Sequence, residues 1–337
     1  VTPTDSAVGT IAMVEPGTGH IKALANSREY GPEGDGYSMV NYAVDKDLGN
    51  SNGIQSGSAI KPFVLAAAIN QGISLNTRIN SPQQINMSND PDYQPRNSTR
   101  GGNITMRQAT EWSTNTYFVQ LTERTGICEP ATIAEKAGLR HATGEPLKQV
   151  PSFALGANEV SPLGMAGGFG MFANRGEYCE SVAVLEVRDR DGNTLVEREP
   201  ECDRVLDKAV ADGVNDVLKG VIETPGATGN RMQLEDGRPA AGKTGTTNGS
   251  IAVWFVGYTP QLVAAAAVAD VEPPLTTLDG REYNGEVMPR AFGGTLPGPM
   301  WKAAMDEALE DEDPEDIRRP DPKVVSGIDG DDDDDDD

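Results

Sequence analysis

Three short strings of reactive residues stand in order along the chain: Ser58-Ala59-Ile60-Lys61, Ser113-Thr114-Asn115 and Lys243-Thr244-Gly245-Thr246. A serine hydroxyl is a poor nucleophile until a base removes its proton, and a lysine can be that base when burial or a nearby cation lowers its pKa. Ser58 and Lys61 are three residues apart at the start of a predicted helix, so their side chains share one face. The candidate roles are therefore Ser58 as nucleophile and Lys61 as its base. The plainer explanation is coincidence, since the bare pattern Ser-x-x-Lys occurs by chance in most proteins.

The second string falls on a connection between two predicted helices. Ser113 can there pass a proton to a leaving amine, and Asn115 can hold a substrate amide group. The plainer explanation is helix capping, since serine, threonine and asparagine all favour that position.

The third string lies on a predicted strand. A period of two places the hydroxyls of Thr244 and Thr246 on one side, where they can bind a carboxylate. Gly245 allows a substrate backbone to approach closely, and Lys243 supplies positive charge. The backbone N–H groups of Thr246 and Ser58 are candidates for an oxyanion hole. The plainer explanation is a strand bent at a glycine.

The elements around these strings predict an α+β fold with a mainly antiparallel sheet flanked by helices. An N-terminal hairpin is expected to join the C-terminal strands. The sheet lobe would come from residues 1–30 and 240–310 and the helical lobe mainly from 55–235, with the active-site cleft between them. The predicted strands cover 9–14, 20–25, 241–247, 252–258 and 262–270, and the predicted helices cover 58–69, 105–112, 117–124, 130–137, 163–174, 208–223 and 299–309.

Charge and hydropathy restrict the classes of function. Residues 306–337 contain 17 acidic and three basic side chains, so −14 of the net charge of −24 lies in this tail. Such a run repels itself, so we expect 311–337 to be disordered and 1–310 to form the domain. Without a basic patch, nucleic-acid binding is not expected. The longest apolar run, 262–269, is too short to cross a membrane, and no signal peptide is visible at Val1, which suggests part of a longer protein.

Two of the three cysteines fit a hairpin. Cys179 and Cys202 lie almost equally far from a predicted turn at 189–193, so a hairpin would place them within disulfide reach. We predict a disulfide between them, which would indicate an oxidising compartment. Two free thiols in a reducing compartment are the alternative.

The three strings together match the set shared by penicillin-binding proteins and class A β-lactamases. The flanking residues 57–63, 242–247 and 254–260, with the turn at 15–19, resemble the transpeptidase domain of class A penicillin-binding proteins. The similarity covers about residues 8–309, and the pair of cysteines resembles actinobacterial members.

The resemblance implies a penicilloyl-serine transferase fold and a D,D-transpeptidase of peptidoglycan synthesis. Ser58 would attack the D-Ala-D-Ala carbonyl of a stem peptide with Lys61 as base and Ser113 as proton relay, and an amine of a neighbouring stem would then take up the acyl group. β-Lactam antibiotics would acylate Ser58. Asn115, Lys243, Thr244 and Thr246 would bind the donor, and neither a metal nor another cofactor is expected.

The family normally carries a membrane anchor and a glycosyltransferase domain ahead of this domain, which implies a place on the extracytoplasmic face of the bacterial membrane. Three alternatives use the same residues: a D,D-carboxypeptidase, a β-lactamase and a non-enzymatic β-lactam sensor. A β-lactamase needs a group that activates water, and neither Glu111 nor Glu123 is marked by its surroundings for that role.

Overall fold

The structure, a computed structural model, describes residues 1–32, 34–87 and 93–327. Residues 328–337, the end of the tail that the sequence predicts to be disordered, therefore lie outside the described residues.

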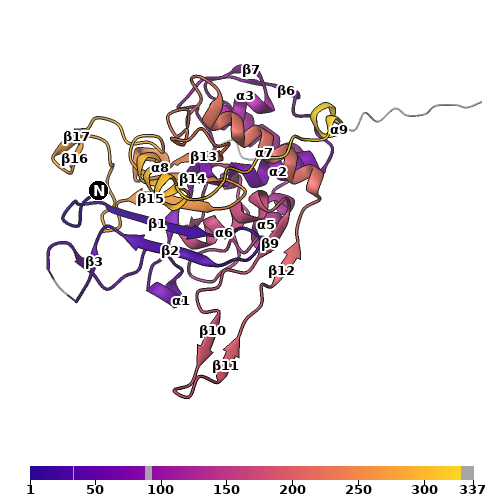
Figure 1. Ribbon diagram of the computed structural model, residues 1–337. Helices are drawn as coiled ribbons and strands as arrows, with labels where there is room; N and C mark the ends of the chain where they lie inside the picture. The colour runs from indigo at the N-terminus through magenta and orange to yellow at the C-terminus, as the bar shows by residue number, and fades with distance from the viewer. Residues whose placement is uncertain (33, 88–92, 328–337) are drawn as a thin grey trace, which may run out of the picture.

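A five-stranded antiparallel sheet forms the centre of the described part of the chain, in the order β13-β14-β15-β1-β2 (Figure 1). Its strands are β1 (Val8–Val14), β2 (Ile21–Asn26), β13 (Ala241–Thr246), β14 (Ala252–Tyr258) and β15 (Val263–Ala269). Every residue of β14 and β15 is buried, because both faces of these apolar strands are covered. The N-terminal hairpin pairs with the C-terminal strands through β1 and β15, so the predicted α+β fold is confirmed.

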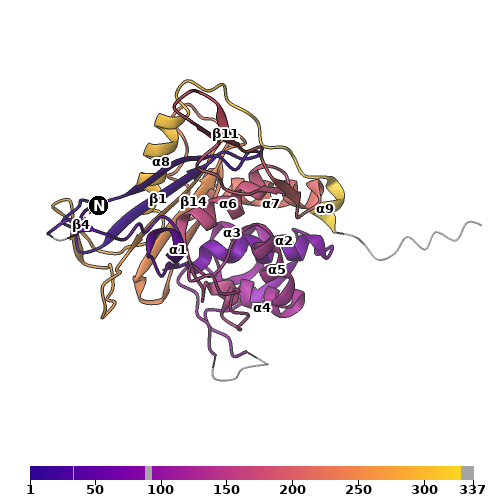
Figure 2. The ribbon, with the colours of Figure 1, turned by 90° about the horizontal axis from the view of Figure 1, so that it is seen from below.

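Helices cover both faces of this sheet (Figure 2). On one face, α8 (Pro297–Ala308) packs on β14 and β15, and the buried Trp301 donates a hydrogen bond from Nε1 to Gly257 O at 2.9 Å. On the other face lies α6 (Pro162–Ala173), against β1 and β15. α7 (Lys208–Glu223) runs beside β13, the edge strand that carries the third string.

The second string and the residues after Ser58 belong to a helical layer beside the sheet. Its central helix, α2 (Lys61–Asn70), is buried at every position except its last and contacts α4, α5 and α7. An apolar helix of this kind is stable only when neighbours enclose it. The surrounding helices are α3 (Met106–Glu111), α4 (Asn115–Thr125) and α5 (Cys128–Lys136).

Shorter elements connect these layers. They are α1 (Lys46–Gly49), α9 (Pro322–Ser326), β3 (Glu29–Tyr30), β4 (Tyr37–Ser38), β5 (Ile54–Gln55), β6 (Arg78–Ser81), β7 (Gly102–Thr105), β8 (Glu159–Val160), β9 (Glu177–Cys179), β10 (Glu186–Arg188), β11 (Thr194–Glu197), β12 (Cys202–Arg204), β16 (Arg281–Tyr283), β17 (Glu286–Met288) and the 3₁₀ turns Gly57–Ile60, Phe153–Leu155 and Asn248–Ser250.

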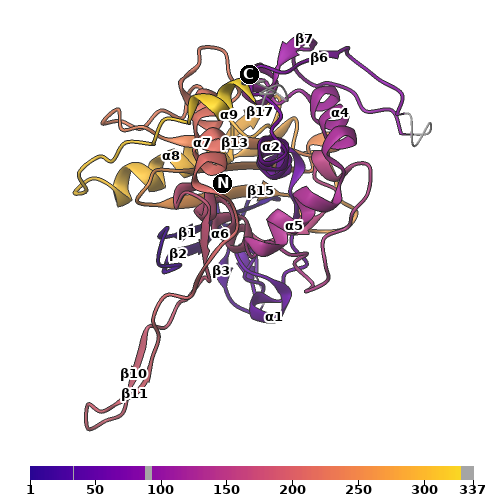
Figure 3. The same ribbon diagram turned by 90° about the vertical axis from the view of Figure 1, so that its right-hand side faces the viewer.

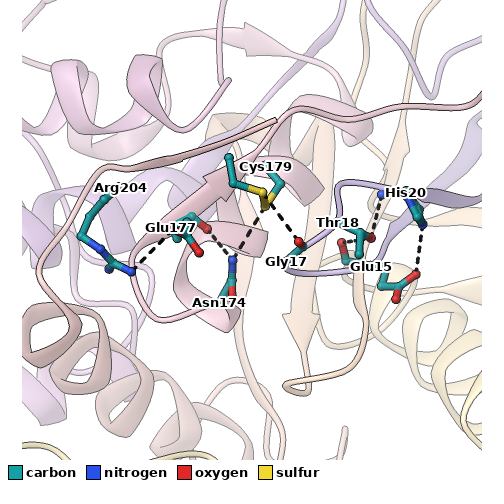
Figure 4. Close-up of a disulfide and its surroundings, with 9 residues drawn as sticks. Glu15, Gly17, Thr18, His20, Asn174, Glu177, Cys179 and Arg204 are labelled. Carbon is teal, nitrogen blue, oxygen red and sulfur yellow. Dashed lines mark hydrogen bonds and ion pairs between the residues drawn. A yellow bond between two sulfur atoms is a disulfide. The ribbon is translucent and has the colours of Figure 1, made fainter. Parts of the chain in front are cut away.

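The β10–β11 hairpin projects from the body of the domain (Figure 3). At its base β9 pairs with β12, and Cys179 and Cys202 stand opposite each other and form a disulfide with an S–S distance of 2.06 Å. The disulfide lies against the turn between β1 and β2, where Cys202 Sγ is 3.6 Å from Gly17 O (Figure 4). A Cβ on Gly19 would lie 2.0 Å from Glu180 O, so this turn needs a glycine.

Residues 311–327, part of the tail that the sequence predicts to be disordered, make defined contacts with the rest of the domain. Residues 309–313 are held through their backbone carbonyls, since Arg238 donates to Leu309 O and Gln261 to Asp313 O. Farther on, α9 contacts α7, and Ser74 donates a hydrogen bond to Val325 O at 2.9 Å. The apolar residues among the acidic ones bury surface against the helical layer, which the net charge alone did not reveal.

Candidate active site

Ser58 lies on the 3₁₀ turn Gly57–Ile60, and α2 begins only at Lys61. The α-helix therefore begins three residues later than the sequence predicts. Gly57 has φ +52°, and a Cβ at this position would lie 2.8 Å from the carbonyl carbon of Thr246. The turn Gly57–Ile60, which bears the predicted nucleophile and which we call the nucleophile turn, thus touches β13 directly. A Cβ on Gly57 would also lie 2.9 Å from Thr246 N, so the two predicted oxyanion donors, the N–H groups of Ser58 and Thr246, belong to segments in direct contact.

A second glycine holds the turn from the other side. Gly156 has φ +81°, and a Cβ there would lie 2.1 Å from Gly57 N. Ser58 itself is only 9% exposed. The turn is therefore confined between β13 and the segment that contains Gly156.

Lys61 is fully buried and binds the second string. Its Nζ donates to Ser113 O at 2.8 Å and to Asn115 Oδ1 at 2.8 Å, and lies 3.3 Å from Ser113 Oγ. Among the described residues, no hydrogen bond joins Lys61 Nζ to Ser58 Oγ. Unliganded sites commonly have such longer separations before substrate draws the groups together.

Ser113 lies two residues beyond the last residue of α3 and has a left-handed conformation, with φ +56°. Its N–H donates to Thr110 O, and the N–H of Thr114 donates to Ala109 O, which is the hydrogen-bond pattern of a Schellman cap. This turn aims the Ser113 hydroxyl at both lysines: Lys243 Nζ donates to it at 2.8 Å. The first and third strings therefore meet at one oxygen atom of the second.

The third string faces this point from β13. Lys243 is fully buried and also donates to Thr244 O at 2.9 Å. Thr246 is partly exposed and its hydroxyl donates to Gly245 O. A Cβ on Gly245 would lie 2.8 Å from Ser56 O, so the glycine is required where β13 passes the nucleophile turn.

The side chain of Asn115 makes two hydrogen bonds within the protein that the sequence did not indicate. Its Oδ1 accepts from Lys61, and its Nδ2 donates to Arg96 O at 2.8 Å. The irregular segment after β6 continues over this region, since Thr114 Oγ1 donates to Arg100 O and Asn97 bonds Thr116. Asn115 thereby fixes the position of Lys61 Nζ against the segment that contains Arg96.

One site neighbour, Thr228, was missed from the sequence, and it connects the third string to Glu111. Thr244 Oγ1 lies 2.9 Å from Thr228 Oγ1, and Thr228 N in turn donates to Glu111 O. Thr228 belongs to no recognisable string, because its contacts join the loop after α7 to the end of α3. The side chain of Glu111 accepts from Thr224, and among the described residues no hydrogen bond connects it to Ser58.

Burial changes the acid–base properties of both lysines. It lowers the pKa of Lys61 well below its ordinary value, and the positive charge of Lys243 lowers that pKa further. Burial also lowers the pKa of Lys243 to about 7. Because Lys61 experiences both effects, it is the lysine favoured to be neutral, as a general base must be.

The chain that carries this buried Ser-x-x-Lys pair, with a serine between two lysines, also matches a known family. Residues 9–292 match the family described as "Penicillin binding protein transpeptidase domain". The chain belongs to this family.

The transpeptidase domain has relatives in several bacteria. It is 34% identical to penicillin-binding protein 1A of Aquifex aeolicus, over 79% of the chain and 35% of that protein. It is 30% identical to penicillin-binding protein 1A of Mycolicibacterium smegmatis, over 92% of the chain and 39% of that protein. The chain thus spans well under half the length of these relatives. The resemblance to the transpeptidase domain of class A penicillin-binding proteins is confirmed.

A solved structure shows the same fold. The PonA1 protein from Mycobacterium tuberculosis in complex with penicillin V superposes with a TM-score of 0.75 at 26% identity, over 95% of this chain and 83% of that one. Of the helices within the described residues of this transpeptidase domain, none combines the length and the apolar character that crossing a bilayer requires.

Proposed function

We propose that this domain is a serine D,D-transpeptidase that cross-links peptidoglycan stem peptides. The observation that carries the proposal is the meeting of Lys61 and Lys243 at the hydroxyl of Ser113, next to the turn that bears Ser58. A structural core has no need to bury two lysines side by side, because each loses its hydration and repels the other.

The proposed reaction has two half-reactions. Ser58 Oγ attacks the carbonyl carbon of the penultimate D-Ala while neutral Lys61 takes its proton. The N–H groups of Ser58 and Thr246 stabilise the oxyanion. Ser113 relays a proton to the amine of the terminal D-Ala, which leaves as the C–N bond breaks. An amine of a second stem peptide then attacks the acyl-enzyme, and Ser58 recovers its proton.

Lys243, Thr244 and Thr246 are proposed to bind the terminal carboxylate of the donor, with Gly245 allowing its backbone to approach. These proposed roles are supported by the position of β13, which lies at the edge of the sheet and beside the nucleophile turn. β-Lactams present a carboxylate and a reactive amide in the same relation, so they would acylate Ser58. The complex of the relative PonA1 with penicillin V agrees with this proposal.

The partners and location are also proposals. The substrates would be a donor stem ending in D-Ala-D-Ala and an acceptor stem with a free amine. A membrane-anchored glycosyltransferase domain would precede this domain, on the extracytoplasmic face of the membrane. The Cys179–Cys202 disulfide supports that location, because disulfides persist in oxidising compartments.

Intact-mass measurement after incubation with benzylpenicillin tests the site. We expect an adduct that persists for hours in the wild type and is absent in Ser58→Ala. Rapid drug turnover would indicate a β-lactamase instead, and absence of any adduct would refute the site assignment. A stem pentapeptide incubated with and without an acceptor amine then separates transpeptidase from D,D-carboxypeptidase, since only the former gives a cross-linked product. A sensor domain would form the adduct and release no D-Ala from the peptide.

A further inference from the structure

A chain of hydrogen bonds lies behind Thr244 in the third string. Thr244 Oγ1 is 2.9 Å from Thr228 Oγ1, and Thr228 Oγ1 is 3.2 Å from Glu111 O. The same carbonyl accepts a second hydrogen bond, from Thr228 N, at 2.9 Å. The strand that is proposed to bind a carboxylate is therefore connected to the last residue of α3, two residues before Ser113.

The directions of these bonds follow from the number of protons. A backbone carbonyl can only accept, so the contact with Glu111 O uses the single hydroxyl proton of Thr228. Thr228 Oγ1 must then accept from Thr244, which directs the Thr244 proton away from the position of a bound carboxylate. In this arrangement Thr244 has no proton to offer a substrate.

The second donor to Glu111 O removes this difficulty. Because Thr228 N already satisfies the carbonyl, the Thr228 hydroxyl can rotate toward Thr244 Oγ1 without leaving a buried acceptor unpaired. Thr244 then accepts from Thr228 and donates its own proton to the carboxylate. Each hydroxyl in such a chain polarises the next, so the bond to the carboxylate is strengthened.

The backbone holds the two hydroxyls in this relation. A Cβ on Gly293 would lie 2.8 Å from Thr244 Cβ, and one on Gly294 would lie 3.0 Å from Thr228 O. The glycine pair therefore packs directly on both threonines. Rotation about the C–O bonds is the movement that remains available to the hydroxyl groups.

We propose that Thr228 is a positioning residue for carboxylate recognition, which accepts the Thr244 proton in the free domain and donates to Thr244 when a substrate carboxylate binds. The inference rests on the proposed function and adds a residue outside the three strings. It makes the specificity of the site for a free carboxylate depend on a hydroxyl that does not itself touch the substrate.

The test compares benzylpenicillin with its methyl ester, which has the same reactive ring and no carboxylate. The rate constant of acylation is measured for both compounds by intact mass. In Thr228→Val we expect acylation by benzylpenicillin to slow about 5- to 10-fold, the effect of one hydrogen bond, while acylation by the ester changes less than about twofold. Thr228→Ser keeps the hydroxyl and should restore the wild-type ratio.

Thr224→Val is the matched control. The Thr224 hydroxyl also donates to Glu111, whose Oε1 accepts at 3.1 Å, but within the described part of the chain it makes no hydrogen bond to Thr244. We expect both of its rate constants to equal those of the wild type. The ratio of the two rate constants is measured within one protein sample, so a reduced folded fraction in a variant cancels.

The outcomes separate this inference from the proposed function. An equal loss for both penicillins in Thr228→Val, or an unchanged rate with benzylpenicillin, would overturn the role of Thr228 and leave the transpeptidase proposal standing. A wild-type protein that forms no adduct at Ser58 would overturn both.

Discussion

The confinement of the nucleophile turn by Gly156 leads to a quantitative prediction. A methyl group at this position would lie 2.1 Å from Gly57 N, whereas real Cβ contacts are essentially never shorter than 3.0 Å. In Gly156→Ala the backbone around Gly57 must therefore move by about 1 Å, and Ser58 is the next residue. A displacement of about 1 Å in a reacting group typically reduces the rate about 100-fold.

Stability should fall as well, for two separable reasons. An alanine in the left-handed conformation costs about 1–2 kcal/mol, and overpacking a closed region costs about 1–3 kcal/mol more. Gly144→Ala is the control, because Gly144 has φ +88° and its Cβ would meet no atom within 4 Å. It carries the backbone strain without the clash.

The assay measures acylation by benzylpenicillin and the thermal unfolding of both variants. In Gly144→Ala we expect the free energy of unfolding to fall by about 1–2 kcal/mol and the acylation rate to equal that of the wild type. In Gly156→Ala we expect a larger loss of stability and acylation that is about 100-fold slower. If Gly156→Ala acylates within a factor of about two of Gly144→Ala, the contact with Gly156 does not position Ser58 and the reasoning fails.

Three further predictions follow from the site and its surroundings. Acylation should rise with pH and reach its plateau well below the ordinary pKa of lysine, because burial and the charge of Lys243 favour neutral Lys61; in Lys243→Gln the rising limb should move to higher pH in stopped-flow measurements. Preference for benzylpenicillin over its methyl ester should decline above about pH 7, where Lys243 loses its charge; a constant ratio from pH 6 to 9 would contradict this. Replacing Cys179 and Cys202 by serine should cost about 3 kcal/mol of stability, as expected for a loop of this size, and leave acylation unchanged; an unchanged unfolding midpoint would show that the disulfide contributes nothing.

The sequence predicted most of the elements because the signals are local. Neighbouring residues specify each of these signals: the continuous apolar runs of β14 and β15, the turn before β2 and the amphipathic α7. The same holds for the projecting hairpin, where pairing at a fixed register determines that Cys179 faces Cys202.

Contacts between distant segments were not predictable in this way. A spacing of three suggested that Lys61 faces Ser58, yet the hydrogen bonds of Lys61 Nζ go to Ser113 and Asn115, more than fifty residues away. The pairing of Thr228 with Thr244 likewise depends on how α7 packs against β13. For residues 311–327 the acidic composition gave no indication of the contacts that Ile317, Val324 and Val325 make with the core.

The geometry also determines how substitutions in the three strings must be interpreted. Ser113 Oγ lies within hydrogen-bond distance of both Lys61 and Lys243, so replacing any one of the three side chains changes the hydrogen bonding at this shared oxygen, although each lysine keeps another acceptor. A slower acylation rate in a single variant would then have two causes: the missing side chain and the altered hydrogen bonds of its neighbours. Double-mutant cycles between Lys61 and Lys243 should therefore be strongly non-additive, whereas a cycle between Lys61 and Thr228, which share no hydrogen-bond partner, should be close to additive.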